Sequence, residues 1–81
     1  MAIPLTDLDR GKTGKVLEIS GGRGIRQKLD ALGIRTGVKI KKISSQILRG
    51  PAIVQAGNTK VAIGYGMAGK IIVDVVHHEH K

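Results

Sequence analysis

Residues 20–37, SGGRGIRQKLDALGIRTG, form the one stretch of this chain with helical periodicity, and glycines bound it on both sides. Ile25, Leu29 and Leu32 recur at i, i+4 and i+7, so they should share one face of about two helical turns. The other apolar runs are short and have the spacing of strands. The chain therefore predicts one short helix inserted into a fold that is otherwise built from β-strands.

The glycines around this helix are suited to tight connections. Gly33 is placed to take the left-handed conformation after the last turn, with Ile34 packing back on Leu29 as in a Schellman ending. Arg26 and Asp30 are four residues apart on the outer face, where such a pair contributes a few tenths of a kcal/mol. Most of the glycines in this segment are thus explained by the tight connections that lead into and out of the helix.

Five short runs rich in valine and isoleucine are strand candidates: 14–20, 38–44, 52–56, 59–63 and 71–76. Strict alternation fails in the first two runs, since Val16 conflicts with Ile19 and Val38 conflicts with Ile43. Such slips indicate bulges, which are typical of short strands that coil into a small barrel. Gly57-Asn58 predicts a two-residue hairpin turn between the third and fourth runs. We expect a mainly β fold, a small barrel of about five strands with a helix after the first.

The chain has 81 residues, which is enough for one domain with a shallow core, and we expect a single domain over residues 1–81. The net charge is +8, and eleven of the fourteen lysines and arginines lie between Arg10 and Arg49, beside two acids. A positive half of this kind fits an acidic partner, or a solvated face that keeps a small protein soluble.

Three sequence features bear on where the protein is located: cysteine content, the length of the apolar runs and the character of the first residues. There is no cysteine for a disulfide or a thiolate metal site. The apolar runs are far shorter than the ~20 residues that span a bilayer, and the first residues do not resemble a secretory signal. We expect a cytoplasmic protein without membrane insertion.

Two glycine motifs resemble nucleotide sites and are rejected. GYGMAG (64–69) fits G-x-G-x-x-G, but the twelve residues after it cannot supply the further helix, strand and acid of a dinucleotide fold. GKTGK (11–15) precedes a strand, and Thr6 stands where a Walker loop needs its first glycine. The GGRG segment (21–24) before the helix could receive a carboxylate of a partner protein, or be an exposed turn.

The last residues, HHEHK, contain His77, His78, Glu79 and His80, which are ligand types for zinc or iron. Neighbouring strand residues point to opposite faces, and a terminus rarely fixes ligand geometry. Elsewhere the acids are scattered, and no nucleophile, base and acid can be combined into a catalytic set. We therefore expect a binding module and not an enzyme, with no catalytic, cofactor or metal residues and no cofactor.

Several segments together resemble the FeoA family, the ferrous iron transport proteins A and their single-domain relatives. The resemblance runs over residues 4–76 and depends on PLTDL (4–8), KLDALGIRTG (28–37), GPAIVQAGNTKVAIG (50–64) and MAGKIIVDV (67–75). It implies an SH3-like barrel with a helical insertion, and it leaves the tail at 77–81 outside the matched core. A similar domain also ends the iron-dependent repressors of the diphtheria-toxin-repressor type.

The resemblance further implies a cytoplasmic accessory of FeoB, a membrane ferrous-iron transporter with a cytosolic G-protein domain, whose uptake such proteins support or regulate by contact. The family offers no agreed catalytic residues to carry over. We predict that Arg23, Arg26 and Arg35 around the helix contact the partner, with Tyr65 and Met67 as apolar anchors in the GYGMAG loop. As an alternative, Tyr65 and Met67 cap the open end of the barrel.

Two other functions stay open. The first is a basic, SH3-like RNA-binding protein, although one tyrosine with no phenylalanine or tryptophan leaves little to stack bases on, and we do not expect nucleic acid as the partner. The second is a small transition-metal-binding protein that uses the histidine tail. An exposed strand edge could also pair chains into a homo-oligomer.

Overall fold

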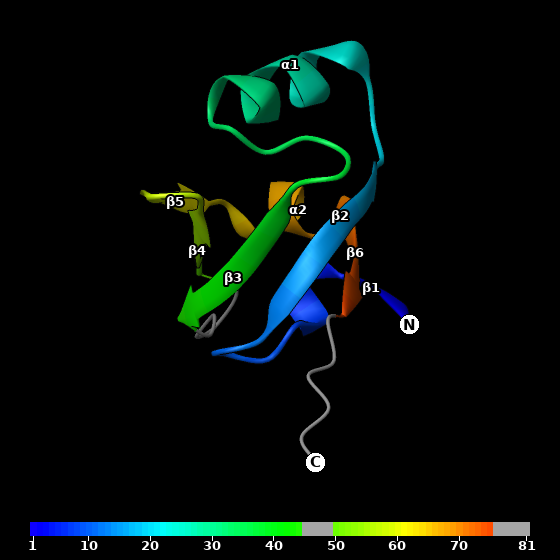
Figure 1. The fold of residues 1–81 in the computed structure, drawn as a ribbon. Helices are drawn as coiled ribbons and strands as arrows, with labels where there is room; N and C mark the ends of the chain where they lie inside the picture. The colour runs from blue at the N-terminus through cyan, green and yellow to red at the C-terminus, as the bar shows by residue number, and fades with distance from the viewer. Residues whose placement is uncertain (45–49, 76–81) are drawn as a thin grey trace.

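The computed structural model of this chain describes residues 1–44 and 50–75. In chain order the elements are β1 (Ala2–Pro4), a 3-10 turn η1 (Leu5–Asp7), β2 (Thr13–Ile19), α1 (Arg23–Ala31), β3 (Lys39–Ser44), β4 (Ala52–Ala56), β5 (Thr59–Ile63), α2 (Tyr65–Ala68) and β6 (Ile71–Val75) (Figure 1). Helix α1 stands beyond the ends of β2 and β3, apart from the strands.

All strand pairs are antiparallel, and the strands follow the order β1-β6-β2-β3-β4-β5 in one bent sheet. The expected mainly β architecture with a helix after the first long strand is confirmed. Two differences stand out: β1 adds a sixth strand, and the sheet stays open between β5 and β1. Strand β1 has three residues and ends at Pro4, which is too short a run for alternation to reveal.

Both predicted slips in alternation are real irregularities of register. The pairing of β2 with β6 shifts between Val16 and Glu18, and the pairing of β3 with β4 shifts between Lys42 and Ser44. Each shift bends its strand and lets the short sheet curl around its core. The Gly57-Asn58 turn also forms as expected, closing the β4–β5 hairpin with Ala56 opposite Thr59.

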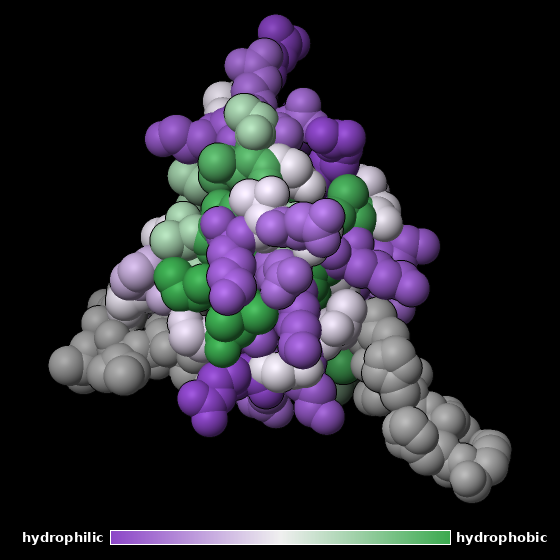
Figure 2. All heavy atoms as spheres, turned by 60° about the vertical axis from the view of Figure 1, so that its left-hand side comes forward, coloured by the Kyte–Doolittle hydropathy of each residue, from purple (hydrophilic) through white to green (hydrophobic). Residues whose placement is uncertain are grey.

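The core lies on the concave side of the sheet and is closed at one end by α1. Its fully buried aliphatic members include Leu5, Val16, Leu29, Ile34, Ile40, Val54, Ile71 and Val73. On the side of the molecule where β3, β4 and β5 lie, hydrophilic side chains cover much of the surface, with apolar ones between them (Figure 2).

The end of α1 is the Schellman motif that the glycine pattern predicts. Gly33 has φ +87° and donates its N–H to the oxygen of Asp30 at 2.9 Å, while the N–H of Ile34 reaches the oxygen of Leu29 at 2.9 Å. The expectation that Leu32 faces the core with Leu29 is wrong, because the Leu32 side chain is 40% exposed. The helix ends at Ala31, and the buried Ile34 covers Leu29 in place of Leu32.

Candidate partner-binding surface

The outer surface of α1 is basic from its first residue. The chain leaves β2 through Gly21, at φ +104°, and α1 begins at Arg23 after Gly22, with no side chain capping its amides. Arg23 and Arg26 are both exposed near this end. The positive end of the helix dipole disfavours cations there by about 0.3–1 kcal/mol each. These arginines therefore do not stabilise the start of the helix.

Beside α1, the helix and the following turn enclose a shallow hollow at the end of β2. We name it the arginine hollow and define it by Ile19, Arg23, Arg26, Asp30, Ile34 and Arg35, which all line it. Ile19 and Ile34 are buried and supply an apolar floor, while the three guanidinium-bearing residues are exposed around them. The structure thus brings together the three arginines that the sequence analysis singled out.

Asp30, the acid of this hollow, forms its ion pair with Arg35 and not with Arg26. Arg35 Nε donates to Asp30 Oδ1 at 2.6 Å, and both side chains are more than half exposed. The predicted Arg26–Asp30 pair is wrong, because the turn at Gly33 returns Arg35 to the carboxylate. Within residues 1–44 and 50–75, neither Arg23 nor Arg26 has a carboxylate within ion-pair distance. No acid of the described residues therefore neutralises these two charges by a direct ion pair.

Tyr65 and Met67 lie elsewhere, on α2, where a loop was expected. Tyr65 is 42% exposed, whereas Met67 is half-buried and packs against the core beside the buried Ala68. Neither residue is among those that line the arginine hollow. The packing of Met67 is in keeping with the capping alternative, and the anchoring role of both residues stays a prediction.

Sequence reasoning missed a lysine in the core. Lys42 is 1% exposed, and its Nζ donates to the main-chain oxygens of Leu5 at 3.1 Å and Leu8 at 2.8 Å. This ammonium ties η1 and the residue after it to β3. The sequence contained a signal for this. Residues two apart in a strand share one face, so Lys42 should face inward with Ile40.

Burial lowers the pKa of Lys42 below its usual value of 10.5, because the charged form loses its hydration. The carboxylates of Asp9 and Asp7 oppose this effect by favouring the ammonium, but desolvation is the larger influence. Its two main-chain hydrogen bonds and its 1% exposure give Lys42 a structural role within β3.

Residues 1–44 and 50–75 contain no group of three or more histidines, cysteines or acids arranged to hold a metal ion. The histidine tail, whose residues 77–80 belong to the metal-binding alternative, lies outside the described residues. In the same part of the chain, neither helix has the length and apolar character needed to cross a membrane.

Taken together, the open six-stranded sheet, the inserted helix and the basic hollow define a small SH3-like β domain. The chain belongs to the FeoA family, since its residues 3–75 match the family model described as FeoA domain. The family is a small transport-related domain and is not a known enzyme.

Relatives of this chain support the assignment. A protein of Methanocaldococcus jannaschii with the provisional name Fe(2+) transport protein A is 38% identical over 71 residues, which cover 88% of this chain and 84% of that protein. A crystal structure of the iron uptake regulatory protein FeoA superimposes with a TM-score of 0.85 at 37% identity, over 94% of this chain and 99% of the other. A manganese-dependent transcriptional repressor, at 22% identity, shares the fold, with a TM-score of 0.85 over 93% of this chain and 42% of its own length.

Proposed function

We propose that this chain is a non-enzymatic, cytoplasmic accessory protein of ferrous-iron uptake, which contacts the cytosolic face of a FeoB-type membrane transporter. Membership of the FeoA family supports the role in iron transport. The observation that carries the contact itself is the arginine hollow, where three arginines surround an apolar floor.

The chemistry of this hollow fits an acidic protein surface. A guanidinium presents a planar fork of donors that matches a carboxylate with two parallel hydrogen bonds. Ile19 and Ile34 beneath the arginines would bury an apolar side chain of the partner and keep water away from the ion pairs. The net charge of +8 would speed the approach of a negatively charged partner.

The direct test is binding to the purified cytosolic domain of the transporter from the same organism, with Arg23 and Arg26 both replaced by glutamate. We expect the double variant to lose at least about tenfold in affinity, since truncation of an interface hot spot, a class enriched in arginine, costs about 2 kcal/mol or more. The matched control replaces Lys39 and Lys41 by glutamate, which changes the net charge equally on the exposed side of β3.

Titrations at low and physiological salt, with and without a structured RNA as competitor, separate the alternatives. An equal loss in both double variants would mean that net charge alone drives the contact, and would refute the arginine hollow as the site. If RNA removes all binding at physiological salt, the RNA-binding alternative gains and the accessory role is refuted.

A further inference from the structure

Among the described residues, strand β5 has a neighbouring strand on one side only. It is the last strand in the order and pairs with β4 over its whole length. Because Ala56 and Thr59 flank a two-residue turn, they form the hydrogen-bonded closing pair of the hairpin. The alternation of antiparallel pairs then turns the N–H and C=O groups of Lys60 and Ala62 away from β4. Within the described residues, no other element's backbone hydrogen-bonds to these groups.

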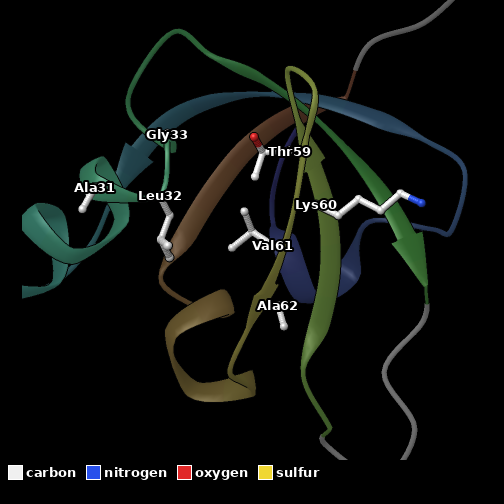
Figure 3. A pocket seen from close by; sticks show the side chains of 7 residues that line it. All are labelled: Ala31, Leu32, Gly33, Thr59, Lys60, Val61 and Ala62. Atoms are coloured by element: carbon white, nitrogen blue, oxygen red, sulfur yellow. The ribbon is translucent and has the colours of Figure 1, made fainter.

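The end of α1 faces this edge across an open groove. Residues 31–33 and 59–62 line it, and we name it the β5 groove. Leu32 and Val61 point into the gap from its two sides, whereas Lys60 points away from it (Figure 3). The groove therefore combines a row of unused backbone groups with Leu32, a leucine that the helix ending leaves 40% exposed.

We propose that the β5 groove binds an extended, acidic segment of a partner protein, which adds to the sheet beside β5. Unpaired donors and acceptors along a strand edge are a template for another extended backbone, which adds to the sheet as a further strand. Side chains of the added segment would alternate between two faces. One set would lie against the exposed Leu32 in the gap, over the mostly buried Val61, and should be apolar. The other set would stand beside Lys60 and should be acidic.

Charge decides between a partner segment and a second copy of this chain. Lys60 is the charged residue among those that line the groove, and two copies would bring together molecules of net charge +8. An acidic segment is attracted both by Lys60 and by the positive net charge, whereas a second copy is repelled by both. Arg23, Arg26 and Arg35 are not among the residues that line the β5 groove. The groove thus goes beyond the proposed function and can be tested apart from the arginine contact.

The experiment uses the full chain and a capped peptide of about ten residues in which valine and glutamate alternate. A control peptide has the same composition, with the valines and glutamates in two blocks. Backbone amide exchange followed by NMR is the readout. On saturation with the alternating peptide, we expect the Lys60 and Ala62 amides to exchange at least about tenfold more slowly. The amide of Val61, which already faces β4, should change little.

A pair of leucine variants tests the apolar side of the groove. Leu32→Ser should weaken binding of the alternating peptide by about tenfold. Leu17→Ser should leave it unchanged, because Leu17 is similarly exposed, at 42%, but lies on β2. The proposal is overturned by an absence of peptide binding, or by binding without protection of the two outward amides. It is also overturned if Leu32→Ser abolishes a dimer of this chain, since the occupant would then be a second copy. Loss of peptide binding in the Arg23 and Arg26 double variant, with Leu32→Ser unaffected, would move the peptide to the arginine hollow.

Discussion

Replacing Lys42 by methionine measures what the buried ammonium contributes to folding. Methionine has a similar length and an apolar side chain, so it leaves no large cavity. The substitution removes both donors that Lys42 directs at the oxygens of Leu5 and Leu8. The net effect is the loss of two charge-assisted hydrogen bonds, offset by the removal of a charge that is unfavourable to bury.

The substitution leaves only one of the two carbonyl oxygens without a hydrogen-bond donor. The Leu5 oxygen also accepts the N–H of Leu8 at 3.1 Å and keeps a partner. Within residues 1–44 and 50–75, the Leu8 oxygen has no donor besides Lys42. One orphaned buried acceptor destabilises a protein by about 1–3 kcal/mol. We therefore expect Lys42→Met to lower the free energy of unfolding by about 2 kcal/mol, and to lower Tm by roughly 8–16 °C in a domain of this size.

The assay is urea and thermal unfolding followed by circular dichroism, with Lys41→Met as the control. Lys41 is the exposed neighbour on the same strand, and its substitution should change stability by less than about 0.5 kcal/mol. A Lys42→Met protein as stable as the parent, or more stable, would refute the reasoning. In that outcome the desolvation of the ammonium would outweigh the hydrogen bonds that it makes.

The pH dependence of stability, compared between the parent and Lys42→Met, independently tests the direction of the Lys42 pKa shift. Because the pKa of folded Lys42 lies below 10.5, the folded chain loses this proton first as pH rises. Between the lowered pKa and 10.5 the unfolded chain binds more protons, so folding becomes more favourable with pH. The stability of the parent relative to Lys42→Met should rise in that alkaline window and stay level at neutral pH. A relative stability that falls there would contradict the lowered pKa.

Two further substitutions probe the sheet and the arginine hollow. Gly14→Ala would place a Cβ 2.8 Å from the Cβ and Cγ2 of Val73, so we expect a loss of about 1–3 kcal/mol in urea unfolding; a loss below about 0.5 kcal/mol would show that Val73 can move aside. Asp30→Asn removes the exposed ion pair with Arg35 and should change stability by less than about 1 kcal/mol, with the difference vanishing in high salt. If the partner surface is acidic as proposed, the same variant should bind the transporter domain more tightly, and weaker binding would contradict the assignment of the hollow.

Part of the candidate site could be predicted from the sequence because it depends on local chemistry. The arginines were identified by their position around the one helical segment, and the structure gathers them around one hollow. The pairing of Asp30 was not predictable from helical spacing, because the turn after Gly33 brings Arg35 back to it. The β5 groove was equally hidden, since Leu32 has the spacing of a core residue and only the helix ending exposes it.

The sequence by itself determined the parts of the fold that nearest neighbours along the chain decide. Short β-branched runs, the Gly57-Asn58 turn, the Schellman glycine and both bulges follow from backbone preferences within a few residues. Tertiary structure alone decided how far the sheet closes, where Lys42 finds its acceptors and which side chains meet across the gap beside β5. These features join segments that are distant in sequence, and the burial that selects them exists only once the sheet has curled around its core.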